Sequence, residues 1–140
     1  MHPMSTKRAV FSILAGAAFA SLLSADDASI ARGKYLVDEV SRCGLCHTPA
    51  AADGQPDAAK VLKGGVINLQ PIQAVAGWHK TAPDITSTSR LWQRYGDAGV
   101  VKFLETAAWP NGGKADLPMP AYKLSHDDSQ AIVDYLHSLK

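Results

Sequence analysis

The 140-residue sequence has neither a strong charge of one sign nor a rich set of cysteines. Its 14 Lys and Arg nearly balance 13 Asp and Glu, which argues against a nucleic-acid-binding surface. No stretch alternates apolar and polar residues long enough to predict a β-strand. Only two cysteines are present, and they lie together. The length fits a single small domain, so its function must be inferred from a few residues.

The first 25 residues have the pattern of a cleaved signal peptide. Lys7 and Arg8 precede the apolar run "AVFSILAGAAFASLLSA", residues 9–25, which is short for a bilayer span of about 20 residues. We expect cleavage after Ala25, with Ala20 as the alternative position. Residues 26–140 are then one exported, periplasmic domain that keeps no stable membrane insertion.

The stretch "RCGLCHTPA" places Cys43 and Cys46 two residues apart and His47 directly behind them. A disulfide across so short a loop would constrain the unfolded chain little, and a thioredoxin-type site would follow a strand. A zinc site needs further ligands, and the later histidines are scattered: His79, His126 and His137. C-x-x-C-H is the attachment signature of c-type haem, in which each thiol adds to one vinyl group. The sequence therefore predicts one covalent haem c per chain, with His47 as an axial ligand of its iron.

The second axial ligand is expected to be Met119. It is the only methionine after residue 25, and it lies between Pro118 and Pro120. Both prolines fix φ and have no N–H group, so they keep this segment out of a helix. A thioether sulfur on a stiff loop suits a permanent iron ligand. His79, in "GWHKTAPD", is the rival candidate.

Apolar spacing predicts three helices, over residues 29–40, 97–109 and 125–140. Asp97 and Ser125 are the expected N-caps, and Ser125 begins a Ser-x-x-Asp capping box. Loops rich in Gly and Pro join these helices. A large flat cofactor would order the long segment 48–123 by burying its apolar residues.

The strings "ARGKYLV", "CGLCHTP", "LPMPAY" and "AIVDYLHSLK" together resemble class I cytochrome c. They are most similar to monohaem domains found in, or serving, periplasmic sugar, alcohol and aldehyde dehydrogenases. The resemblance implies a small all-α fold whose terminal helices cross, with Gly33 facing Tyr135 and the loops wrapped around one haem. It also implies that the Pro83 carbonyl accepts a hydrogen bond from His47 Nδ1. Asp84 departs from the usual Asn, and the segment between His47 and Pro83 is longer than in such domains.

With His47 and Met119 both bound, the iron has no open position, so the expected function is electron transfer and not enzymatic catalysis. The expected partners are a periplasmic dehydrogenase as electron donor and a terminal oxidase or another cytochrome as acceptor. The alternative is a haem enzyme or gas-binding sensor in which the distal ligand is labile.

Overall fold

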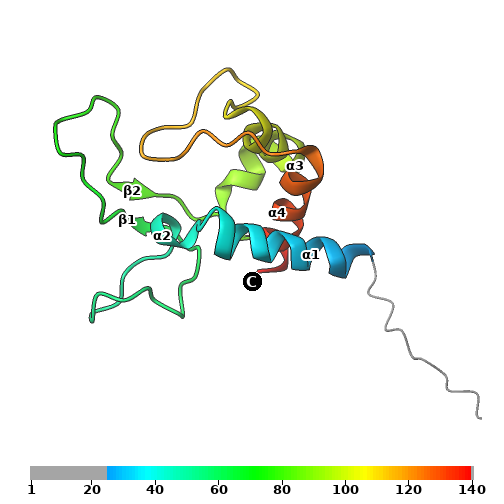
Figure 1. Ribbon diagram of the computed structural model, residues 1–140, viewed down its shortest axis with the longest axis horizontal. Coiled ribbons are helices and arrows are strands. Elements are labelled where there is room, and N and C mark those ends of the chain that lie inside the picture. The colour runs from blue at the N-terminus through cyan, green and yellow to red at the C-terminus, as the bar shows by residue number, and fades with distance from the viewer. Residues whose placement is uncertain (1–24, 140) are drawn as a thin grey trace, which may run out of the picture.

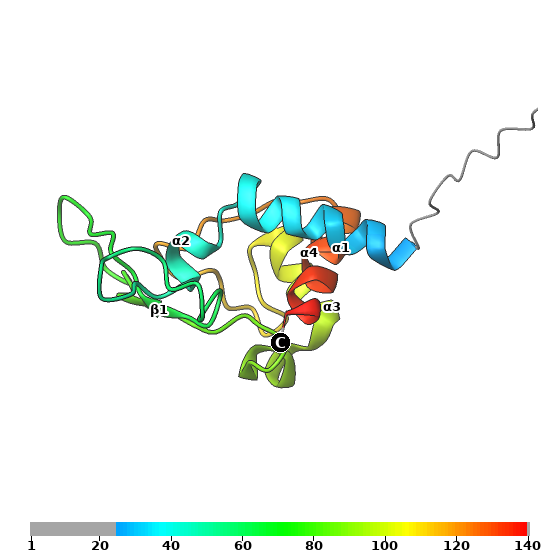
Figure 2. The same ribbon diagram turned by 90° about the horizontal axis from the view of Figure 1, so that it is seen from below.

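The computed structural model describes residues 25–139, and its longer helices gather on one side of the molecule (Figures 1 and 2). Four α-helices, one π-helical turn and two short strands follow in this order: α1 (Ala25–Tyr35), η1 (Leu36–Val40), α2 (Gly44–His47), β1 (Gly65–Val66), β2 (Thr81–Ala82), α3 (Arg90–Thr106) and α4 (His126–Ser138). Apart from Ala25, the predicted signal peptide lies outside the described residues. No helix within residues 25–139 is long and apolar enough to cross a bilayer.

The terminal helices α1 and α4 cross at close range, as both ribbon views show. A Cβ atom on Gly33 would lie 1.8 Å from the carbonyl oxygen of Ala131 and 2.7 Å from Tyr135 Cβ. Gly33 and Tyr135 therefore meet as the resemblance implied, and the backbone of Ala131 comes closer still. Only a residue without a side chain fits at this crossing.

Helix α4 forms as the sequence predicts. The Ser125 side chain accepts a hydrogen bond from Asp128 N at 3.2 Å, which satisfies one free N–H of the first turn. Ile132, Tyr135 and Leu136 are buried in the core. They pack there with residues of the other elements, chiefly Leu36, Val37, Leu62, Val100, Val101, Phe103 and Leu104.

Helix α3 begins seven residues before the predicted N-cap at Asp97. Ser89, whose extended backbone ends the preceding loop, comes directly before the first helical residue, Arg90. Gly96 then interrupts the helix with a φ of 63° and a ψ of 174°. Sequence spacing detected only the part after this break, because the part before it is too short to show a period. The helix ends at Thr106, and the next residue, Ala107, adopts a left-handed conformation.

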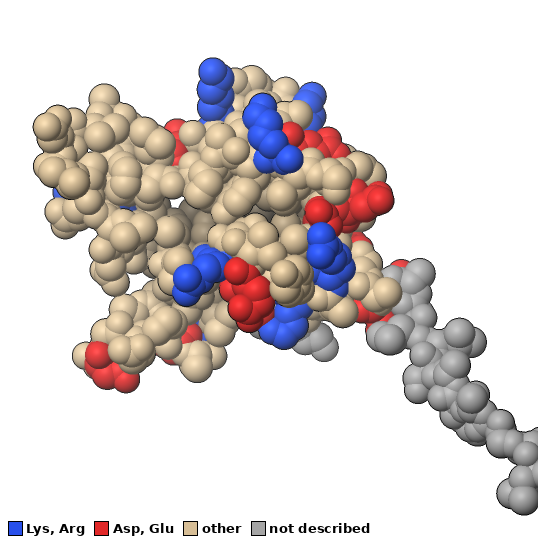
Figure 3. Space-filling model, viewed as in Figure 1, with Lys and Arg blue, Asp and Glu red and all other residues tan. Residues whose placement is uncertain are grey.

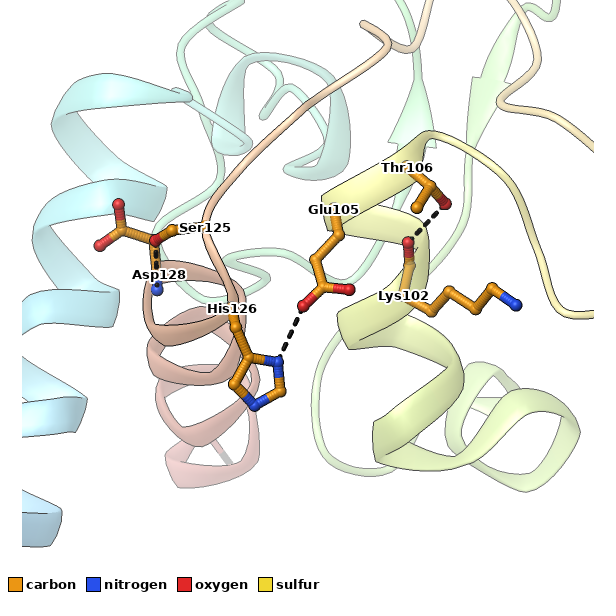
Figure 4. A network of polar contacts seen from close by, with 6 residues as sticks. All are labelled: Lys102, Glu105, Thr106, Ser125, His126 and Asp128. Carbon is orange, nitrogen blue, oxygen red and sulfur yellow. Dashed lines mark hydrogen bonds and ion pairs between the residues drawn. The ribbon is translucent and has the colours of Figure 1, made fainter.

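Two histidine–carboxylate pairs join α3 to α4. His126 Nδ1 lies 2.8 Å from Glu105 Oε1, as Figure 4 shows, and His137 Nε2 lies 2.8 Å from Asp97 Oδ1. An open groove of about 530 Å³ is lined by Asp97, Glu105 and His126 of these pairs and by none of the predicted haem ligands. His126 and His137 are both exposed, and their contacts connect α3 and α4.

The all-α prediction is incomplete, because β1 and β2 form a small antiparallel sheet. Gly65 pairs with Ala82 and Val66 with Thr81, and Ile67 N donates to Lys80 O at 2.9 Å. Two residues cannot show a period of two, so no sequence pattern reveals these strands. The sheet lies beside α2, away from the crossing of the terminal helices (Figure 1).

Candidate functional site

The short helix α2 and its N-cap residue Cys43 place both cysteines and His47 on one turn of chain. Arg42 precedes it with a φ of 50°, and the Cys43 N–H donates to Val37 O at 3.0 Å, so the turn is tied to the end of the N-terminal helix. His47 N in turn donates to Cys43 O at 2.9 Å. This one-turn helix fixes the spacing of the two thiols and the imidazole.

His47 is buried, with 6% of its surface exposed, and its Nδ1 lies 2.8 Å from the carbonyl oxygen of Pro83. Burial lowers the pKa of His47, although the Pro83 carbonyl acts in the opposite direction, so the ring is neutral at neutral pH. A carbonyl can only accept a hydrogen bond, so Nδ1 carries the single ring proton. Nε2 then has a free lone pair, and no described residue forms a hydrogen bond with it.

Cys43 and Cys46 are both half-buried and form no disulfide. Burial raises the pKa of Cys43 to about 11, so this side chain is an uncharged thiol at neutral pH. A cysteine active in disulfide exchange has the opposite property, a lowered pKa that favours the thiolate. No three His, Cys, Asp or Glu side chains gather into a metal cluster among residues 25–139, and a structural zinc site would need such a cluster.

Met119 is half-buried and packs against the edge of the core, as Cys43 does. Its segment is joined to the segment before Cys43, because Tyr122 OH donates to Ser41 O at 3.1 Å. Burial raises the pKa of Tyr122, because it disfavours the charged phenolate. Tyr122 therefore links the Met119 loop to the segment directly before Cys43, a role that the sequence pattern did not indicate.

The rival ligand His79 lies on the surface. Its side chain is 54% exposed, and its Nε2 lies 3.7 Å from Asp116 Oδ2. The His79 N–H donates to Leu117 O at 2.7 Å, so the loop between β1 and β2 is attached to the Met119 loop. His79 thus supports the Met119 loop through its backbone while its ring faces a carboxylate.

The donor set and its surroundings fit a covalently bound haem. A neutral imidazole with a free Nε2, a thioether and two free cysteine side chains are the groups that c-type haem uses. Cys43 and Met119 belong to a rim of partly buried side chains that pack against the core, and the rim is mostly apolar: Ile85, Trp92, Trp109, Ala115, Tyr122 and Leu124 are also part of it. An apolar rim of this kind suits a macrocycle that is itself apolar. Cys43, Cys46 and His47 would hold the group on one side, and Met119 belongs to the loop that covers this region.

Known proteins with similar sequences are named as cytochrome subunits. A model of the cytochrome c family matches residues 30–140. The chain is 33% identical over 124 residues to the cytochrome c subunit of a quinone-type alcohol dehydrogenase from Gluconobacter oxydans (strain 621H), covering 83% of this chain and 25% of that subunit. It is 34% identical over 123 residues to the gluconate 2-dehydrogenase cytochrome c subunit of Pantoea cypripedii, covering 81% and 27%.

A fructose dehydrogenase cytochrome subunit from Gluconobacter japonicus is 32% identical over 116 residues, covering 77% of this chain and 21% of that subunit. The chain thus spans only about a quarter of the length of these relatives. The family match, in contrast, covers the described domain almost completely, including the C-x-x-C-H turn and the Met119 loop. The chain belongs to the cytochrome c family.

Proposed function

We propose that this chain is an exported, monohaem electron carrier, in which Cys43 and Cys46 bind one haem c and His47 and Met119 are its axial ligands. The observation that carries the proposal is the hydrogen bond of 2.8 Å between His47 Nδ1 and Pro83 O, at the end of a helical turn that carries two free cysteines. This bond leaves Nε2 available and holds the ring in one orientation. A haem bound there would supply one-electron exchange at its iron.

The proposed ligands would restrict this site to electron transfer. His47 is held by the Pro83 carbonyl, and Met119 lies on a loop tied to both neighbouring segments through Tyr122 and Leu117. Ligands fixed in this way change position little when an electron is gained or lost. Two permanent ligands also leave no position for peroxide, oxygen or substrate, which distinguishes the carrier from a haem enzyme or gas sensor.

The partners and the location are proposed on the basis of the names of the relatives and of the N-terminal sequence. Three relatives are named as cytochrome subunits of alcohol, gluconate and fructose dehydrogenases. A periplasmic dehydrogenase is therefore the proposed electron donor. The acceptor is a terminal oxidase or another cytochrome of the respiratory chain. Residues 1–25 are the proposed signal peptide, because a basic pair precedes the apolar run there.

Contact with these partners is proposed to be apolar. Leu45, next to Cys46 on α2, is 61% exposed, and Leu117 beside the Met119 loop is 46% exposed. Residues 64–78 contain no Lys, Arg, Asp or Glu, and the corresponding lobe in Figure 3 is almost free of charged side chains. The surface around the proposed haem edge therefore has no strong field of one sign to steer a charged partner.

An absorption spectrum of protein matured with haem-attachment machinery tests the proposal. A reduced spectrum typical of low-spin c-type haem, together with a weak near-infrared sulfur-to-iron band in the oxidised protein, is the expected result. A high-spin spectrum that changes on adding cyanide or carbon monoxide would instead support the enzyme or sensor. A colourless chain would contradict haem binding altogether.

A further inference from the structure

The segment Leu62–Gly65 lies between the chain segment of His47 and the chain segment of Pro83. On the side of His47, Leu62 N donates to Thr48 Oγ1 at 3.0 Å. Gly64 N donates to His47 O at 2.7 Å. Leu62 and Thr48 are both buried, so this connection is shielded from water and not easily exchanged for solvent.

On the other side, the same segment is attached to the residues that follow Pro83. Leu62 O accepts a hydrogen bond from Ile85 N at 3.0 Å. Lys63 Nζ donates to Thr86 Oγ1 at 2.9 Å, and that hydroxyl in turn donates to Asp84 Oδ1 at 2.7 Å. Segment Leu62–Gly65 is therefore bonded to both segments whose separation determines the His47–Pro83 hydrogen bond.

The two consecutive glycines of this segment, Gly64 and Gly65, have no space around them for a side chain. Gly64 has a φ of +80°, and a Cβ there would lie 2.6 Å from Asp84 N and from Pro83 C. A Cβ on Gly65 would lie 2.8 Å from Pro49 Cα. All of these neighbours are backbone atoms, which cannot rotate away as a flexible side chain can. Each glycine thus allows a close approach, one toward Pro83 and the other toward the chain that follows His47.

We propose that the Gly64–Gly65 pair is a positioning element that sets how closely Pro83 O approaches His47 Nδ1. The strength of this hydrogen bond determines the orientation and the basicity of the imidazole. The glycine pair would thereby tune the iron ligand without touching it. The effect on the iron rests on the proposed function, whereas the effect on the His47 proton does not.

The test compares Gly64→Ala with Gly77→Ala in the full, haem-matured protein. Gly77 has nearly the same backbone strain, with a φ of +77°, but a Cβ there would have no neighbour within 4 Å. Hydrogen exchange of the His47 Nδ1 proton, followed by NMR in the reduced protein, is the main measurement. We expect exchange at least about tenfold faster in Gly64→Ala and changed by less than about twofold in Gly77→Ala. The reduction potential should rise in Gly64→Ala relative to Gly77→Ala, because a less basic imidazole stabilises the oxidised iron less.

A milder pair of variants keeps the test decisive if Gly64→Ala does not fold. Lys63→Met removes the bond to Thr86, whereas Lys60→Met removes an equal charge from a surface pair with Asp57. Faster Nδ1 exchange in Lys63→Met alone would support the proposal. Equal exchange rates within each pair would overturn it. A wild-type chain without haem would refute the proposed function, and the exchange of the His47 proton in the variants would still decide the positioning role.

Discussion

Gly33→Ala should destabilise this protein, although alanine is the better helix former. Inside an exposed helix the change from Gly to Ala gains about 1 kcal/mol. Here the added Cβ would lie 1.8 Å from Ala131 O and 2.6 Å from Ala131 C, both backbone atoms of α4. Ordinary contacts begin at 3.4 Å, so α1 and α4 would have to separate by roughly 1.6 Å at this point.

Separation of these helices would loosen the most tightly packed part of the core. Val37 and Val133 have no exposed surface, and Leu36 and Ile132 are nearly as deeply buried. Overpacking of this kind typically costs about 1–3 kcal/mol, and contact with rigid backbone places Gly33→Ala at the upper end. After the gain in helix propensity, we expect a net loss of about 2 kcal/mol and a fall in Tm of about 8 °C.

Thermal unfolding of the haem-matured protein, followed by circular dichroism, measures this effect. Ala31→Gly is the matched control, because Ala31 is an exposed residue of the same helix and the reverse substitution measures propensity alone. Ala31→Gly should lower stability by about 1 kcal/mol. A Gly33→Ala protein more stable than the wild type would show that the helices do not cross at this residue.

Three further predictions concern the iron ligand, pH and docking. Met119→Ala should lose the near-infrared band, lower the reduction potential and bind external ligands, whereas His79→Ala should keep the band; the opposite pattern would transfer the ligand role to His79. The hydrogen bond from Arg32 lowers the pKa of Asp128. The Arg32–Asp128 pair therefore stabilises the fold at neutral pH, and this stabilisation is lost as pH falls below about 4. An Asp128→Asn protein with an unchanged acid-unfolding profile would contradict this prediction. Leu45→Glu should slow electron transfer with a dehydrogenase at an unchanged potential, and wild-type rates should depend weakly on salt; a steep fall in rate with added salt would indicate docking through a charged patch.

Local signals in the sequence predicted the helices that form through local interactions. Ser125 and the acidic residues after it identify the start of α4, because the cap is a contact between residues three positions apart. The start of α3 could not be predicted in the same way. Arg90–Tyr95 is too short to show a period, and the N-cap of the helix was predicted at Asp97, directly after the break at Gly96.

The features of the site that depend on contacts between distant residues could be predicted from the sequence only in part. The C-x-x-C-H spacing identifies its chemistry by itself, whereas Pro83 was found through the family resemblance and not through any local pattern. The double glycine that begins at Gly64 was predicted only as part of a loop, because its close approach to Pro83 depends on the folded chain. Tyr122 likewise gave no signal, because its bond to Ser41 joins residues far apart in sequence.

The intact mass of the matured protein tests the central claim most directly. The account predicts that the chain, expressed with haem-attachment machinery, exceeds the mass of residues 26–140 by one haem. A Cys43→Ser and Cys46→Ser double variant should have only the mass of the bare chain, because covalent attachment needs a thiol. A wild-type protein with the mass of the bare chain, made under conditions in which another c-type cytochrome matures, would contradict the account.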